Sequence, residues 1–117
     1  VRDAAMARVS GTQVISAADA QAAMNAGALT LVMNGVRTTM DKRVLTMGRS
    51  RDRDLVIPDP NVSRSHCEIR HVGYDYFIID LDSTNGVEVN GHMVSRHALV
   101  DGDRIMLGTT EIRVELS

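Results

Sequence analysis

Residues 47–91 read MGRSRDRDLVIPDPNVSRSHCEIRHVGYDYFIIDLDSTNGVEVNG, and this stretch decides the fold. It alternates short apolar and β-branched runs with three polar loops, at residues 48–54, 59–65 and 82–86. Runs of this kind, bounded by Gly, Pro, Asn and Asp, are typical of short strands joined by turns. The loops concentrate hydroxyl, amide and guanidinium groups, which is the chemistry of a site that binds an anion.

The strand pattern continues on both sides of this stretch. Asn34-Gly35 and Asn90-Gly91 each separate two such runs and favour two-residue hairpin turns. We expect strands at residues 29–33, 36–40, 44–47, 54–57, 66–71, 76–81, 87–89, 92–94, 104–107 and 110–116. Turns at this spacing predict an all-β, antiparallel β-sandwich of about eleven strands.

Strand alternation within residues 66–71 separates two faces. Cys67 and Ile69 fall on one face, which we expect to lie in the core, whereas His66 falls on the other and is expected to face the loops or solvent.

The first 27 residues differ from the rest, being rich in Ala, Met, Ser and Gln. High helix propensity from residue 17 to residue 26 allows a short helix, and a disordered leader fits equally well. We therefore divide the chain into a leader, residues 1–27, and one β-sandwich domain, residues 28–117. Because the chain begins with Val1 and not with Met, we expect it to be a piece of a longer protein.

Composition excludes several classes of protein. The formal net charge of −2 gives no overall field that would attract nucleic acid or an anionic membrane. The single cysteine, Cys67, cannot form an intrachain disulfide and fits a reducing compartment. No run approaches the roughly 20 apolar residues that cross a bilayer, and no secretory signal is present. We expect a cytoplasmic location without membrane insertion.

The side chains of the three loops that could hold a phosphate are Arg49, Ser63, Arg64, Thr84 and Asn85. A phosphorylated side chain carries a charge of about −1.5 to −2 and three acceptor oxygens, which guanidinium and hydroxyl donors complement. The same residues are also compatible with ordinary turns and solvated arginines.

Three motifs, in order and spacing, resemble the signature of the forkhead-associated (FHA) domain: Gly48-Arg49, Ser63-x-x-His66 and Asn85-Gly86. The strings VSRSH (62–66), DSTNGVEVNG (82–91) and LVDGDRIMLG (99–108) resemble it too. The resemblance extends over residues 29–115. It implies a β-sandwich that reads phosphothreonine, holds no cofactor or metal and catalyses nothing.

The resemblance also implies roles for individual residues. The residues implied to contact the phosphopeptide are Arg49, Ser63, Arg64, Thr84 and Asn85. Of these, Asn85 would bind the peptide backbone. Support of the site falls to Gly48, which would let its loop turn, to His66, which would buttress the Ser63 loop by hydrogen bonding, and to Gly86. The implied partner is a phosphothreonine-containing protein or peptide, such as a Ser/Thr protein kinase or its substrate, in bacterial signalling.

Other functions use the same residues. Ser63 with His66 suggests a serine hydrolase, but the nucleophile elbow is missing. His66, Cys67 and His71 are zinc-ligand types without a Cys-x-x-Cys pair. The loop arginines could form a nucleic-acid patch, but aspartates interrupt it and no aromatic residues are interleaved. The remaining alternative is a structural or protein-interaction scaffold that is independent of phosphate.

Overall fold

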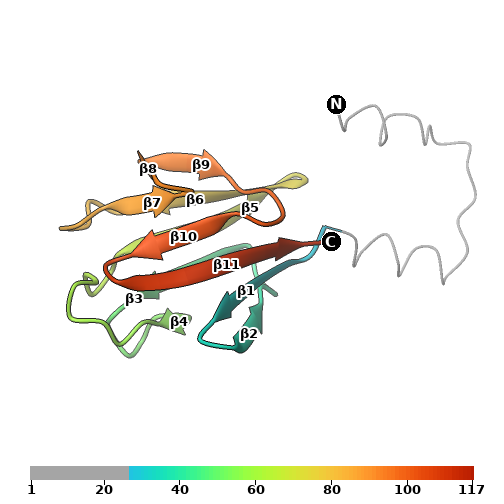
Figure 1. The fold of residues 1–117 in the computed structure, drawn as a ribbon. Helices are drawn as coiled ribbons and strands as arrows, with labels where there is room; N and C mark the ends of the chain where they lie inside the picture. Colours follow the sequence, from blue (N-terminus) through green and yellow to red (C-terminus); the bar gives the residue numbers. More distant parts are fainter. Residues whose placement is uncertain (1–26) are drawn as a thin grey trace, which may run out of the picture.

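A computed structural model describes residues 27–117, and this part of the chain is a two-layered β-sandwich (Figure 1). Its eleven strands are β1 (Leu29–Met33), β2 (Val36–Thr39), β3 (Val44–Gly48), β4 (Leu55–Val56), β5 (Cys67–Val72), β6 (Asp75–Asp80), β7 (Val87–Val89), β8 (His92–Val94), β9 (Arg96–Ala98), β10 (Arg104–Leu107) and β11 (Thr110–Leu116). The predicted sandwich is confirmed. The expectation of a short helix or disordered leader falls on residues 1–26, which lie outside the described residues.

The strands form a six-stranded sheet, in the order β2-β1-β11-β10-β7-β8, and a five-stranded sheet, in the order β4-β3-β5-β6-β9. The paired strands are antiparallel with one exception, because β3 and β4 run parallel, with Met47 opposite Leu55. The sequence predicted an antiparallel sandwich, and this single parallel pair was not foreseen. Residues 49–54 loop back and return the chain beside the strand that it has just left.

The core lies between the two sheets and is mostly aliphatic. Alternation along β5 leaves Cys67 and Ile69 fully buried, as predicted, while Arg70 is exposed. His66, immediately before β5, does point to the loops, but it is 0% exposed. Of the two expected surroundings, the loops and not the solvent surround the ring, because the loops close over it.

Both predicted hairpin turns are confirmed. Asn34-Gly35 joins β1 to β2 and Asn90-Gly91 joins β7 to β8, and all four residues have positive φ. Two consecutive positive φ values match the right-handed twist of the flanking strands. Strand β9 was missed because its residues, Arg-His-Ala, have neither alternation nor β-propensity, and its pairing with β6 defines it.

The polar loops gather at one end of the sandwich. The end opposite the C-terminus holds four segments, namely residues 49–54, 57–66 and 81–86 and the turn at 108–109 (Figure 1). We call this the loop end. It joins positions up to about 60 residues apart in sequence, since the antiparallel strands return to it repeatedly.

We expect Ile69→Ala to lower the free energy of unfolding by about 3 kcal/mol, because it leaves a cavity in the core. The measurement is urea denaturation followed by circular dichroism. Val36→Ala is the control, since Val36 is 62% exposed on β2, and it should cost less than about 0.5 kcal/mol. Equal effects of the two substitutions would contradict the assigned core.

Candidate functional site

Backbone hydrogen bonds join the first two loops of the loop end. The Arg49 N–H donates to the Ser63 carbonyl at 3.0 Å, and the Ser50 N–H donates to the Arg64 carbonyl at 3.3 Å. A Cβ added to Gly48 would lie 2.1 Å from the Arg64 carbonyl oxygen. Gly48 ends β3 and has no positive φ. Close backbone contact, and not the expected turn, therefore requires glycine at this position.

The buried ring of His66 connects the second loop to the third. Its Nδ1 accepts the Ser63 N–H at 2.9 Å, and its Nε2 lies 2.8 Å from the Gly86 carbonyl oxygen. Because Nδ1 is an acceptor, Nε2 carries the proton and donates to that carbonyl. The neutral imidazole thus fixes the Ser63 loop and the Gly86 turn at once.

Two further hydrogen bonds bring the third loop against the second. The Thr84 N–H donates to the Ser63 hydroxyl oxygen at 3.0 Å, and Asn85 Nδ2 donates to the Asn61 carbonyl at 2.8 Å. Ser63 therefore keeps its hydroxyl proton for another acceptor. The amide oxygen of Asn85 accepts no hydrogen bond from the described residues and can take an N–H from a bound peptide.

Gly86 has a φ of 82°, so the predicted turn beside Asn85 needs glycine for its backbone. A Cβ at Gly86 would also lie 2.2 Å from Met93 Cε. Beside this contact is a hollow of about 220 Å³ whose lining includes Asn61, Asn85, Glu88, Met93, Met106 and Thr109.

Two arginine side chains at the loop end, those of Arg49 and Arg64, have no neutralising partner among the described residues. Arg49 is exposed and donates from Nε to the Val62 carbonyl at 3.0 Å, which orients its guanidinium. Its terminal nitrogens, and the whole side chain of Arg64, make no hydrogen bond or ion pair with described residues. The oriented guanidinium of Arg49 and the unpaired guanidinium of Arg64, the residue next to Ser63, create a local positive potential.

The nearby aspartates are held elsewhere. Asp54 accepts from Lys42 Nζ at 2.8 Å, which is the main cause of its pKa falling to about 2. A hydrogen bond from the Ser50 hydroxyl and an ion pair with Arg53 lower the pKa of Asp52. These carboxylates are ionised at neutral pH, but they do not compensate Arg49.

Asp59 connects the second loop to the turn between β10 and β11, a role that the sequence reading missed. Its Oδ1 accepts the Asn61 N–H, while its Oδ2 accepts the backbone and hydroxyl groups of Thr109 and the hydroxyl of Thr110, each at 2.8 Å. The Asn61 bond, followed by those from the threonines, holds the pKa of Asp59 far below its usual range. Asp-Pro-Asn signalled a turn, but nothing local pointed to residues 109 and 110.

The geometry does not support hydrolase or zinc chemistry. His66 binds the backbone N–H of Ser63 and not its hydroxyl, so no nucleophile–base pair exists between them. Burial raises the pKa of the Cys67 thiol, and His71 stacks on Tyr76. No group of three potential metal ligands occurs within residues 27–117.

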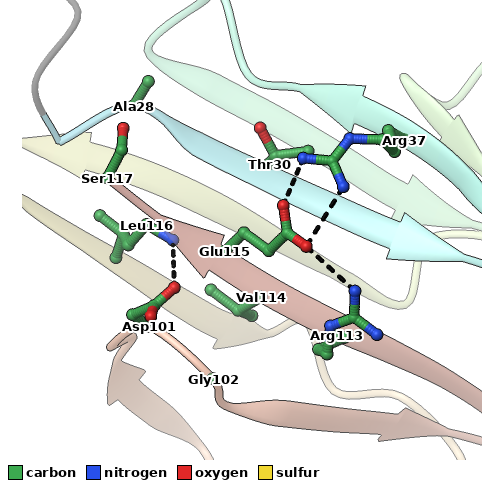
Figure 2. Close-up of a pocket in the computed structure, with 10 residues that line it drawn as sticks. All are labelled: Ala28, Thr30, Arg37, Asp101, Gly102, Arg113, Val114, Glu115, Leu116 and Ser117. Carbon is green, nitrogen blue, oxygen red and sulfur yellow. Dashed lines mark hydrogen bonds and ion pairs between the residues drawn. The ribbon is translucent and has the colours of Figure 1, made fainter.

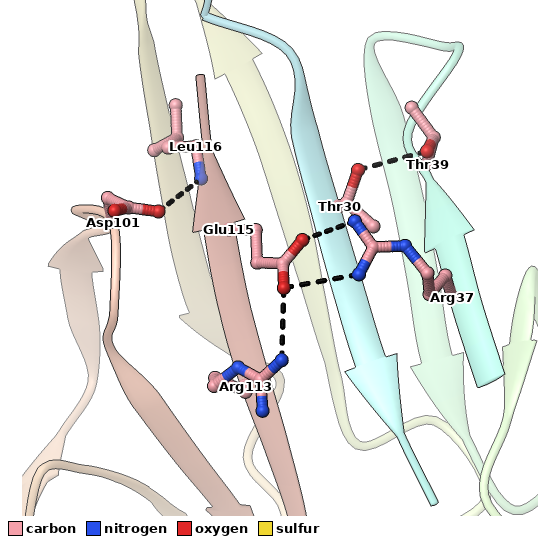
Figure 3. A network of polar contacts seen from close by, with 7 residues as sticks. All are labelled: Thr30, Arg37, Thr39, Asp101, Arg113, Glu115 and Leu116. Atoms are coloured by element: carbon pink, nitrogen blue, oxygen red, sulfur yellow. Dashed lines mark hydrogen bonds and ion pairs between the residues drawn. The ribbon is translucent and has the colours of Figure 1, made fainter. Parts of the chain in front are cut away.

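A larger hollow lies away from the loop end and contains none of the predicted site residues. It measures about 520 Å³ and lies beside the chain ends of β1 and β11 (Figure 2). Glu115 is bound there by Arg37 and Arg113, and Asp101 accepts the Leu116 N–H at 2.8 Å (Figure 3). These contacts link β2, β11 and the turn before β10, which is a structural role. Within residues 27–117, no helix is long and apolar enough to span a membrane.

A family model of the FHA domain matches residues 45–108, more than half of the chain. The chain belongs to the FHA domain family. All eight residues to which the resemblance assigned roles lie at the loop end or in the strand that leads into it. The FHA sandwich thus brings the three polar loops together, and the hydrogen bonds described above hold them in contact.

Known FHA proteins resemble this chain in sequence and structure. It is 46% identical over 70 residues to the FHA domain-containing protein FhaA of Mycobacterium tuberculosis, a match that covers 60% of this chain and 13% of FhaA. It is 35% identical over 74 residues to the glycogen accumulation regulator GarA of Mycolicibacterium smegmatis, with 63% of this chain and 47% of GarA covered. The chain therefore spans less than half the length of either relative.

A solved FHA structure, from work on phosphothreonine-dependent FHA domain interactions, superposes with a TM-score of 0.74 at 38% identity. The match covers 77% of this chain and 97% of that one. The relation thus extends over nearly the whole described domain.

We expect Gly48→Ala to lower the free energy of unfolding by about 3 kcal/mol, because the new Cβ must push the Arg64 backbone away. Gly35→Ala is the matched control. Gly35 has positive φ but nothing within 4 Å, so only backbone strain of about 1 kcal/mol applies. Urea denaturation measures both. A Gly48→Ala variant as stable as the Gly35→Ala variant would contradict the close approach.

Asp59→Asn should lower the urea midpoint at pH 7, because an amide cannot accept the four donors. The pKa of Asp59 is depressed in the folded state, so its contribution is present above its unfolded pKa of about 4 and is lost as pH falls below that value. The difference from wild type should therefore shrink from pH 7 to about pH 3. A difference independent of pH would show that charge is not the cause.

Proposed function

We propose that the loop end binds phosphothreonine on a partner protein, as a non-catalytic module in Ser/Thr kinase signalling. The observation that carries this is the convergence of an anchored guanidinium, Arg49, with a hydroxyl that has a proton to donate, Ser63, in a region where the carboxylates are already paired. A dianion with three acceptor oxygens is the ligand that such a donor set favours.

The donors have separate tasks in this proposal. The terminal nitrogens of Arg49 and the hydroxyl of Ser63 donate to the phosphate, and Arg64 adds a third contact from the joined loops. Thr84 lines the pocket beside Ser63. Asn85, held through its Nδ2, accepts a peptide N–H next to the phosphothreonine and thereby orients the partner's backbone.

The supporting residues reduce the cost of binding. Gly48, His66 and Gly86 hold the loops in position before the ligand arrives, so little conformational entropy is lost on association. One charged group on a shallow surface still provides only modest affinity. We expect a micromolar dissociation constant, which corresponds to about −8 kcal/mol.

The family supports this function and a wider setting. A structural relative takes part in phosphothreonine-dependent interactions, and sequence relatives are regulatory proteins of mycobacteria. We propose that the partner is a bacterial Ser/Thr protein kinase or one of its substrates, met in the cytoplasm. No catalytic step belongs to this site.

The test is calorimetric titration with one peptide in three forms, carrying phosphothreonine, phosphoserine or unmodified threonine. We expect the phosphothreonine form to bind most tightly and the unmodified form not to bind. Equal binding of all three forms would instead identify a scaffold that is independent of phosphate.

Arg49→Ala should weaken phosphothreonine binding at least 30-fold, or about 2 kcal/mol, since the main charge-assisted contact is lost. Stability should change little, because Arg49 is exposed. Arg43→Ala, which removes an exposed arginine near the opposite end of β3, is the control and should retain binding. If Arg49→Ala bound as well as wild type in the titration, the assigned site would be wrong.

A further inference from the structure

One cation at the loop end has no task in the proposed phosphate site. Arg51 is exposed and makes no hydrogen bond or ion pair with any residue of the described chain. Two residues of extended chain span at most about 7 Å, so its Cα lies within that distance of the Cα of Arg49. A long arginine side chain at this position can reach the residues that flank a phosphothreonine bound at Arg49.

The turn that carries Arg51 is held rigidly. The Arg53 N–H donates to the Ser50 carbonyl at 3.2 Å, which places Arg51 and Asp52 at the two corners. Asp52 is tied back by the Ser50 hydroxyl at 2.7 Å and by Arg53 Nε at 3.1 Å. The turn thus restrains its one carboxylate and leaves the Arg51 guanidinium free.

The turn is also fixed to one side of the phosphate site. Arg53 Nη1 donates to the Ser65 hydroxyl at 3.2 Å, and the Ser50 N–H donates to the Arg64 carbonyl. The third loop, in contrast, contacts the second at Asn61 and Ser63. The turn of Arg51 thus contacts the residues that follow Ser63 in the second loop, whereas Asn85 contacts a residue that precedes it.

Charge differs between the two sides. The hollow beside Asn85 is lined by Glu88 and contains no lysine or arginine among its described lining residues. The Arg51 side has the unpaired guanidinium together with Arg64. A negative group is therefore favoured on one side of the phosphothreonine and disfavoured on the other.

We propose that Arg51 is a specificity-determining residue that binds a second negative group of the same partner segment, a carboxylate or another phosphate, on the side of the phosphothreonine away from Asn85. This inference rests on the proposed function of the loop end. It narrows the partner to a phosphothreonine segment that is anionic on one flank. An exposed arginine–carboxylate pair is modest, so we expect a gain of about three- to tenfold in affinity at low salt.

The experiment uses the full chain and an alanine-rich phosphothreonine peptide. Each of the three positions on either side of the phosphothreonine carries, in turn, Glu, the isosteric Gln or phosphoserine. Dissociation constants are measured by calorimetry at about 50 mM and about 300 mM salt. The readout is the ratio of the Gln to the Glu dissociation constant at each position, because a general loss of positive charge affects both peptides of a pair alike.

The wild-type ratio should reach about three to ten on one flank and stay near or below one on the other, and it should fall at high salt. Arg51→Gln should bring the favoured ratio to about one. Arg43→Gln is the control, because it removes an equal charge just before β3, about 16 Å along the strand from its end at Gly48. It should leave the ratio unchanged. A larger gain in affinity from phosphoserine than from Glu would identify a second phosphate as the negative group. Equal gains in affinity would identify a carboxylate.

A ratio near one at every position of wild type, or a favoured ratio that persists in Arg51→Gln, would overturn the inference while phosphothreonine binding itself stands. If the alanine-rich phosphothreonine peptide bound no better than its unmodified form, the proposed function would fail, and the role of Arg51 with it.

Discussion

The structure of the loop end depends on the hydrogen bonds of one buried imidazole. His66 accepts from the Ser63 backbone and donates to the Gly86 carbonyl, so its ring holds together two loops that are 20 residues apart. The ring is 0% exposed, and neither of its polar atoms lacks a partner. A buried polar group without a partner costs about 1–3 kcal/mol, and the two loops therefore have to stay where they satisfy it. Asp59 makes the same kind of connection toward the turn between β10 and β11.

The second constraint is the distribution of charge around this scaffold. The aspartates at residues 52, 54 and 59 are bound by Arg53, by Lys42 and by backbone and hydroxyl donors, respectively. Had they faced Arg49, the site would have been neutral. Because they are restrained elsewhere, a chain of net charge −2 still presents a local cationic surface. Rigidity and local charge together explain how a small domain can recognise one phosphorylated side chain.

Local signals in the sequence were sufficient for ten of the eleven strands, for the Asn-Gly turns and for the core positions of Cys67 and Ile69, since each depends on neighbouring residues. Features that depend on distant contacts were not predictable. The parallel pairing of β3 with β4, the polar strand β9 and the link from Asp59 to Thr109 depend on tertiary structure. Gly48 was singled out for a turn, whereas the close contact with the Arg64 carbonyl that requires glycine there becomes visible only when both loops are in place. The predicted contacts of Arg49, Ser63, Arg64, Thr84 and Asn85 with a phosphopeptide stay predictions.

The most direct test of a preformed phosphothreonine site is an NMR titration of the ¹⁵N-labelled chain with a phosphothreonine peptide. The account predicts that amide shifts concentrate at Arg49, Ser63, Arg64, Thr84 and Asn85, that strands away from the loop end barely respond, and that the unphosphorylated peptide produces no shifts. Shifts spread over the sheet faces, or the same shifts with the unphosphorylated peptide, would contradict it.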